Sequence, residues 1–579
     1  MEAAARSASV AATFDRDQVA MASFPYLQTE TSGRQVGNRL AAILQIIAAL
    51  IWIPQAGALS VAVGRIASGH GADAVVGPAI LVLVLGIAKA LLDAAGGRLA
   101  FRLARKALSD RREQVGLALA GGSPLDVSRP PSGLAASALT EQAEAIVPYL
   151  ARFRPARLRA AVVPVIILLC VLAVSWVAAL ALLFAAPLIP IFMALIGWRA
   201  KAATEQQLGE IGNMNAFLLD RLRGLATIRA LGAVQATATR VRLEGESLRI
   251  RTMAVLRIAF LSSAVLELFA ALGVAMVAVY IGFHLLGQLD FGAWNGKLSL
   301  SEGLFVLLLA PAFFEPLRDL SSAWHDRAAG EAAIEALNRL CCTRASLLGA
   351  DVHSPLSSSR DAPAVRIEGL RYSYPGRSAN VFDGFDLAIA PGEHVALLAP
   401  SGAGKSTLLA LIAGFDAPAD GRVVIADTIL NADNGAQLRR QMAWIGQAPH
   451  IFDGTLVTNV SLGRSEIGPD RVAEALALMQ LDHVRRRGAT VIGEGGLGLS
   501  GGEALRLALA RAAATPGATL ILADEPTAHL DDMTAGEITE ALLSLARGRT
   551  LIVATHDPAL AARMDRVIRL SAPSMEAAA

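Results

Sequence analysis

SGGEALRLALARAAATPGATLILADEPTAHLD, residues 500–531, decides the fold of the C-terminal half of this 579-residue chain. It places the pentapeptide LSGGE, Leu499 to Glu503, about one helix upstream of an apolar strand that ends in Asp524 and Glu525. A strand end of this kind can present one carboxylate to Mg²⁺ and the next to a water molecule. A serine–glycine turn at the start of a helix offers backbone N–H groups to a phosphate. Together the two features predict a nucleotide-hydrolysing domain.

A glycine-rich phosphate loop lies upstream of this stretch. The apolar strand from His394 to Leu398 leads into APSGAGKST, whose glycines let successive N–H groups converge on phosphates. Lys405 is expected to reach the β and γ oxygens, and the Ser406 hydroxyl to bind Mg²⁺. The nucleotide-binding residues expected here are Ser401, Gly402, Ala403, Gly404, Lys405, Ser406 and Thr407. The first glycine of the usual motif is replaced by Ala399, a change that could shift the backbone and lower nucleotide affinity.

Three further residues stand in the order that such a domain requires. Tyr374 lies in the run YSYP, where its ring is placed to stack on an adenine face. Gln447 follows a strand, so its amide could touch both Mg²⁺ and the attacking water. His556 follows another apolar strand and is suited to contact the γ-phosphate. A lone glutamine or histidine would mean little, but this order behind a phosphate loop is specific.

The candidate roles follow from this chemistry. The expected catalytic residues are Glu525, His556 and Gln447. The expected metal ligands are Ser406, Gln447 and Asp524. Glu525 would accept the proton of the attacking water or orient it. The turn formed by Ser500, Gly501 and Gly502 cannot reach the phosphate loop of its own chain if the domain is compact, so it is expected to close over a nucleotide bound by a partner subunit.

The composition indicates a membrane part joined to a soluble part. The chain is 54% apolar and only 18% charged, with a mean hydropathy of +0.49, whereas soluble domains contain about 25% charged residues. A net charge of +2 gives no indication of nucleic-acid binding. Three cysteines, Cys170, Cys341 and Cys342, form no framework of paired spacings, so structural disulfides are not expected.

Six apolar segments are long enough to be membrane helices. They lie at about 40–63, 74–95, 158–175, 177–197, 258–286 and 300–318. No charged residue occurs from Ala160 to Trp198, about twice the ~20 residues that one crossing needs. Two helices must therefore fit there, with a turn expected at Ser175-Trp176.

The connections between the segments predict the orientation. Those after the second and fourth segments are long and rich in arginine, and the other three are short and nearly free of basic residues. Positive loops stay in the cytoplasm, which places both termini and the ATPase half there. The long loops show helical spacing. They are interpreted as membrane helices extended into the cytoplasm, with a short crosswise helix at each tip touching an ATPase domain; the alternative is solvated arginine-rich helices.

Two ionisable residues fall inside the apolar segments, Lys89 in the second and Glu267 in the fifth. A charge in lipid is costly unless it faces a cavity or a partner, so each is a candidate residue of a transport pathway. The alternatives are an interhelical ion pair without a transport role, or for Lys89 a side chain that reaches the membrane surface.

A polar, Ser/Pro-rich stretch separates the two halves. The predicted domains are a cytoplasmic segment (1–38), a transmembrane domain of six helices (39–325), a linker (326–362) and an ATP-binding domain (363–579). The predicted fold class is therefore multi-domain, with an all-α membrane domain followed by an α/β P-loop ATPase domain.

These motifs resemble those of the type I ABC exporters, in which each subunit joins one membrane half to one ATPase half. The resemblance identifies Tyr374 as the A-loop, Gln447 as the Q-loop, His556 as the switch histidine and Asp531 as the D-loop. It also assigns Gly493-Glu494 to an X-loop that contacts the cytoplasmic helix tips. Within that family the membrane half is similar to CydD-type subunits. The stretches that support this are APLIPIFMAL (186–195), FLLDRLRG (217–224), VLRIAFLSS (255–263) and PLRDL (316–320).

The resemblance implies ATP and Mg²⁺ as ligands and a heterodimer with a homologous CydC-like half-transporter in the bacterial inner membrane. It implies export of cysteine or glutathione to the periplasm in support of cytochrome bd assembly, with haem as a rival ligand or cargo. Two alternatives remain open. One is the same machine with lipid, peptide or drug as cargo. The other, from a different class, is a catalytically minor nucleotide-binding subunit that regulates its partner.

Overall fold

The computed structural model describes residues 32–570 apart from gaps at 72, 127–128, 295, 342–345, 350–360, 375–378, 482–483, 485–491 and 493–498. The chain divides into two compact units. The membrane unit comprises Met1–Leu117 and Pro130–Cys342, and the ATPase unit comprises Ala118–Arg129 and Thr343–Ala579. Residues 324–341 form a helix of the membrane unit, whereas the sequence analysis assigned 326–362 to a linker. The predicted domain boundaries themselves stay predictions.

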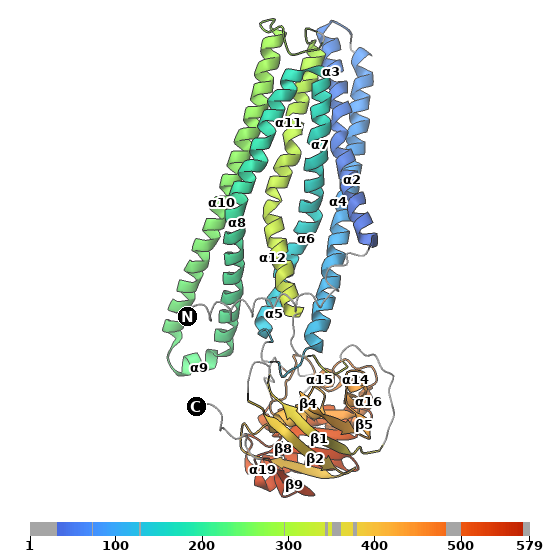
Figure 1. Ribbon diagram of the computed structural model, residues 1–579, viewed down its shortest axis with the longest axis vertical. Coiled ribbons are helices and arrows are strands. Elements are labelled where there is room, and N and C mark those ends of the chain that lie inside the picture. Colours follow the sequence, from blue (N-terminus) through green and yellow to red (C-terminus); the bar gives the residue numbers. More distant parts are fainter. Residues whose placement is uncertain are drawn as a thin grey trace, which may run out of the picture. The chain divides into compact units, whose positions relative to one another are not determined.

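The described secondary structure of the membrane unit consists of helices joined by loops. Its helices are α2 (Ser32–Leu50), α3 (Trp52–Ala67), α4 (Asp73–Gly121), α5 (Ser132–Thr140), η2 (Gln142–Ala145), α6 (Ile146–Pro148), η3 (Tyr149–Phe153), α7 (Arg154–Val174), α8 (Trp176–Arg223), α9 (Leu225–Ala230), α10 (Val234–Leu285), α11 (Leu300–Ser322) and α12 (Trp324–Cys341). Figure 1 shows α8 and α10 side by side, joined at one end by α9.

All six predicted membrane segments fall in these helices. Among the described residues, five helical stretches are long and apolar enough to cross a membrane. They are Gly37–Ala67, Asp73–Gly121, Ser132–Val174, Ala264–Leu285 and Leu300–Cys341. The described apolar part of the remaining segment, Trp176–Pro187, is shorter and opens α8. The chain is therefore a multi-pass membrane protein.

The predicted turn between the third and fourth segments is confirmed. Ser175 is fully buried and extended between α7 and α8. Its hydroxyl donates to the carbonyl oxygen of Gly292 over 2.8 Å and accepts from the N–H of Ala178, so it caps α8 and joins the turn to the loop before α11. A buried hydroxyl needs such partners, because an unpaired one is costly.

The prediction of a crosswise helix at both loop tips is wrong for the first tip. The second tip forms α9 as expected. At the first, α4 ends at Gly121, and Gly122 to Asp126 form a bridge and a turn instead. This segment belongs to the ATPase unit, where the carbonyl of Gly121 accepts from the N–H of Leu347 over 2.9 Å and Leu125 packs on the hydrophobic core. Side-chain packing and backbone pairing thus hold this tip without a helix.

The ATPase unit contains two sheets. The strands are β1 (Val365–Tyr372), β2 (Phe382–Ile389), β3 (His394–Leu398), β4 (Asp420–Ile425), β5 (Thr428–Ile429), β6 (Met442–Ile445), β7 (Leu520–Asp524), β8 (Thr550–Thr555) and β9 (Arg566–Arg569). The helices are α13 (Lys405–Ile412), α14 (Gly435–Arg439), α15 (Leu456–Ser461), α16 (Pro469–Leu478), α18 (Gly501–Ala514), α19 (Asp532–Ala546) and α20 (Pro558–Ala561). An antiparallel sheet has the order β2-β1-β4-β5, and a parallel one the order β6-β7-β8-β3-β9. β7 and β8 are buried throughout, as continuous apolar strands of a covered parallel sheet should be.

Close packing in the membrane unit generates a first prediction. A Cβ at Gly273 of α10 would lie 2.5 Å from the ring of Phe314, which is fully buried, and 3.0 Å from Ala185. We expect Gly273→Ala to destabilise the solubilised protein by about 1–3 kcal/mol, the usual cost of overpacking. Gly282→Ala on the same helix is the control, because a Cβ there meets nothing within 4 Å. Equal melting temperatures for the two variants would contradict this packing.

Candidate functional site

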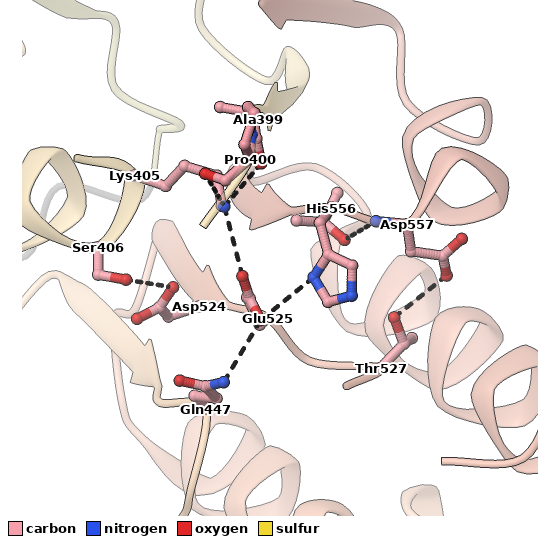
Figure 2. A network of polar contacts seen from close by, with 11 residues as sticks. Ala399, Pro400, Lys405, Ser406, Gln447, Asp524, Glu525, Thr527, His556 and Asp557 are labelled. Atoms are coloured by element: carbon pink, nitrogen blue, oxygen red, sulfur yellow. Dashed lines mark hydrogen bonds and ion pairs between the residues drawn. The ribbon is translucent and has the colours of Figure 1, made fainter. Parts of the chain in front are cut away.

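The candidate site forms where neighbouring parallel strands end together. β8 lies between β7 and β3, with Ala554 opposite Asp524 and Thr555 opposite Leu398. The residues that follow these three strands therefore meet at one edge of the sheet, the usual position of ligand sites in open parallel sheets. Figure 2 shows the side chains from these strand ends, together with Gln447 from beyond β6, pointing toward one another.

The phosphate loop adopts left-handed backbone conformations only where it has glycine. Gly402 and Gly404 have φ angles of 84° and 90°, whereas Ala399 has no positive φ. The methyl group of Ala399 is buried in the core of the ATPase unit, and its carbonyl accepts from Lys405 Nζ over 2.8 Å. Lys405 also donates to the carbonyl of Pro400 over 3.1 Å. Alanine at the first motif position therefore causes no backbone strain.

Ser406 and Asp524 fit a magnesium ion. The Ser406 hydroxyl donates to Asp524 Oδ1 over 3.0 Å. Adjacent oxygens of an octahedral Mg²⁺ shell lie about 2.9 Å apart, so both can join one shell without moving, with phosphate oxygens completing it. Burial raises the pKa of Asp524, and the neighbouring Glu525 raises it further, while the bond from Ser406 and the charge of Lys405 oppose the shift.

Glu525 makes three polar contacts with residues from different parts of the chain. Its carboxylate lies 3.4 Å from Lys405 Nζ and 3.3 Å from His556 Nδ1, and it accepts from Gln447 Nε2 over 3.3 Å (Figure 2). Its φ of 48° is strained for a side chain with a Cβ, and its N–H donates to the carbonyl of Ala554 over 2.8 Å. The backbone bond to β8 thus holds the carboxylate in a conformation that Glu525 would not adopt alone.

Tyr374 lies beside the phosphate loop, as its proposed role requires. Its hydroxyl and that of Thr407 are 2.7 Å apart, and its ring meets that of Tyr372 edge to face. These contacts bring the tyrosine to α13, the helix that follows the loop. Adenine stacking by Tyr374 stays a prediction.

Sequence reasoning missed a threonine–aspartate pair behind the catalytic candidates. Thr527 Oγ1 donates to Asp557 Oδ2 over 3.2 Å, and the N–H of Asp557 donates to Thr555 Oγ1 over 3.0 Å (Figure 2). These bonds join the turn after Glu525 to the residues on either side of His556. The position of Asp557 directly after His556 was the available signal.

The LSGGE turn forms the N-terminus of the 14-residue helix α18. Ser500 Oγ accepts from the N–H of Glu503 over 3.2 Å, and the Glu503 carboxylate accepts from the N–H of Ser500 over 2.7 Å. Gly501 is exposed, whereas a Cβ at Gly502 would lie 2.8 Å from Thr534 on α19. Asp531, the predicted D-loop residue, caps α19 through the N–H of Thr534. The predicted X-loop residues 493–494 lie outside the described residues.

The two charges in the membrane segments have partners. Glu267 on α10 lies 3.2 Å from Arg318 on α11, which agrees with the interhelical ion pair given as the alternative. The ammonium group of Lys89 lies 5.4 Å from the centre of the Trp52 ring, a cation–π distance. A transport role for either residue stays a prediction.

Models of two protein families match this chain, one in each half. The model of the ABC transporter transmembrane region matches residues 39–308, and that of the ABC transporter matches residues 382–528. The glutathione/L-cysteine transport system ATP-binding/permease protein CydD of Haemophilus influenzae is 37% identical over 75% of this chain and 73% of its own length. The transport ATP-binding protein AarD of Providencia stuartii is 34% identical over 92% and 90%. A bacterial Atm1-family ABC exporter with ATP bound shares the fold, with a TM-score of 0.76 and 23% identity over 93% of both chains.

The buried carboxylate at the metal site generates a second prediction. Because the pKa of Asp524 is raised, Mg²⁺ must displace a proton from it at a higher pH than from an ordinary aspartate. The gain in ATP affinity that Mg²⁺ provides should therefore be lost, as the pH falls, at a higher pH than an ordinary aspartate with a pKa of about 4 would give, and titrations from about pH 4 to about pH 8 cover that loss. ATP affinity with and without Mg²⁺ is measured across this range. In Asp524→Asn, Mg²⁺ should raise the affinity for ATP only slightly at any pH. Asp433 is exposed, so Asp433→Asn should behave as the wild type. The same dependence of the Mg²⁺ effect on pH in all three proteins would contradict the prediction.

The family matches over both halves of the chain, and the similarity to relatives over most of their length, agree with the motifs predicted from the sequence. The ATPase unit hydrolyses ATP to drive transport through the helical unit. This chain belongs to the ABC transporters, as a half-transporter of the CydD type whose membrane unit precedes its ATPase domain.

Proposed function

We propose that this chain is one half of a heterodimeric exporter that moves cysteine or glutathione from the bacterial cytoplasm to the periplasm, in support of cytochrome bd assembly. The observation that supports this cargo is 37% identity to a relative named for glutathione and L-cysteine transport. The arginine-rich loops support a cytoplasmic ATPase domain and cytoplasmic termini in the inner membrane. The second half is a homologous CydC-like subunit.

Binding of the nucleotide phosphates would depend on Lys405 and Ser406, which open α13, and on Asp524, which ends β7. Lys405 is 4% exposed and lies at the loop that would surround the phosphates, so its charge acts in a little-hydrated site. Ser406 and Asp524 would hold Mg²⁺, which neutralises charge on the β and γ oxygens. Tyr374 would stack on the adenine from the side of α13.

Activation of water depends on Glu525. Its carboxylate would accept the proton of the attacking water, in a site where only 15% of the side chain is exposed. Gln447 would orient the water and contact the metal ion. His556, 61% exposed and within reach of Glu525, would contact the γ-phosphate. Ser500, Gly501 and Gly502 would close over the nucleotide of the partner, so two chains are needed for two complete sites.

A third prediction concerns the catalytic carboxylate. We expect Glu525→Gln to lower the ATPase turnover of the heterodimer about 10²–10⁴-fold, because a positioned general base contributes this much. ATP binding should persist, since Lys405, Ser406 and Asp524 are retained. Phosphate release and nucleotide binding are measured on the purified heterodimer.

Glu540→Gln is the matched control for that experiment. Glu540 is an exposed glutamate of α19 that pairs with Arg563. Its replacement should leave turnover unchanged. Unchanged turnover in Glu525→Gln would instead favour the regulatory alternative, in which the partner's site performs the hydrolysis.

A fourth prediction separates the cargoes. Inverted membrane vesicles that contain this chain and its partner should accumulate labelled glutathione or cysteine when ATP is supplied, and vesicles with Glu525→Gln should not. Haem is tested in parallel as a stimulator of ATP hydrolysis. Absence of thiol uptake together with stimulation by haem would refute thiol export and favour haem as the cargo.

A further inference from the structure

A polar cavity of about 360 Å³ lies within the membrane unit, among α2, α4, η3, α7 and α11. This volume falls in the range of about 300–1,000 Å³ that is usual for small-molecule sites. Its polar lining residues are Gln45, Asp93, Arg152, Arg159, Asp319 and Ser322. None of its lining residues is a cysteine, histidine or methionine. The described lining of the cavity therefore contains charges of both signs and no sulfur-containing or imidazole side chain.

The arginines retain hydrogen-bonding capacity. Arg159 Nη2 lies 3.1 Å from Asp319 Oδ2, so one edge of its guanidinium pairs α7 with α11. Its Nε is buried and has no hydrogen-bond partner among the described residues. Arg152 lies 3.3 Å from Asp326 and is 64% exposed. A guanidinium has five donors in a planar fork, so each arginine can also bind a carboxylate of a ligand.

Two further lining residues, on α4 and α2, offer hydrogen-bond acceptors. Asp93 on α4 is exposed and forms no ion pair within the described part of the chain. Gln45 on α2 is 7% exposed, and Gly96 leaves room for its side chain, because a Cβ there would lie 2.8 Å from Gln45 Cγ. The lining of the cavity thus combines a carboxylate and an amide from α2 and α4 with two guanidinium groups from η3 and α7.

The position of the cavity suits a cargo that enters from the cytoplasm. Asp93 lies near the end of the apolar segment 74–95, Arg159 at the start of 158–175, and Asp319 directly after 300–318. With the proposed orientation, all three positions lie at the cytoplasmic ends of their membrane helices. Charged residues there avoid the cost of placement deeper in lipid.

We propose that this cavity is an entry site for small zwitterions of the amino-acid or short-peptide class. Arg159, helped by Arg152, binds a carboxylate of the cargo, and Asp93 binds its ammonium group. The site recognises the charged ends and not the thiol, so serine should compete with cysteine. This assignment rests on the proposed export function and adds to it the part of the cargo that is recognised.

Two variants test the assignment through uptake of labelled glutathione by inverted vesicles. Arg159→Lys keeps the charge beside Asp319 but removes the planar fork, and we expect the KM for glutathione to rise about tenfold. Arg339→Gln, which alters an exposed pair on α12 outside the cavity, should leave the KM unchanged. If Arg159 only ties α7 to α11, lysine should restore the wild-type KM, and the proposal is overturned.

Asp93 is tested by changing the ligand and the protein together. N-acetylcysteine lacks the ammonium group, so we expect it to compete with glutathione about tenfold more weakly than cysteine does in the wild type. In Asp93→Asn this difference should nearly vanish. A difference of the same size in both proteins would overturn the role of Asp93.

Binding of labelled glutathione to the purified heterodimer separates this inference from the export function. Binding that depends on Arg159 without any uptake would support the site and refute export. Uptake whose KM for glutathione is unchanged in Arg159→Lys would support export and refute the site. Absence of both binding and uptake would refute both.

Discussion

The parallel pairing of β7, β8 and β3 is the constraint on which the ATPase unit depends. Because Ala554 lies opposite Asp524 and Thr555 opposite Leu398, the three strands end in register. The phosphate loop, the two carboxylates and the switch histidine come from segments far apart in sequence, and only this register brings them together. The side chains of β7 and β8 are buried throughout, so a slip in register would disrupt their packing as well as separate the site residues.

Hydrogen bonds and ion pairs at the strand ends offset the cost of the strained backbone and the buried charges in the site. Glu525 has a left-handed backbone, which costs about 1–3 kcal/mol. Its N–H bonds to β8, and its carboxylate lies near one cation and one amide donor. Lys405 and Asp524 are each less than a tenth exposed, and each has a polar partner. Burying charges in this way costs stability unless they are paired, so the network both positions the site and keeps that cost low.

Charged side chains in and beside the membrane segments have partners on neighbouring helices. Glu267 pairs with Arg318, Lys89 lies over a tryptophan, and Arg159 pairs with Asp319. Close contacts such as that of Gly273 with Phe314 form the apolar interior between α10 and α11. The interior is therefore packed there, whereas the polar groups of the proposed entry site gather among α2, α4, η3, α7 and α11.

The sequence alone determined the motifs, their order and the six membrane segments, because phosphate loops, strand-end carboxylates and long apolar runs are local patterns. It did not determine that the backbone of Ala399 needs no glycine, that the described residues 122–126 of the first loop tip form no helix, or that Asp557 supports the strand ends. Nor could it bring Asp93, Arg159 and Asp319 to one cavity. Those features depend on backbone angles and on contacts between residues far apart in the chain, and only the tertiary structure decides which of these contacts form.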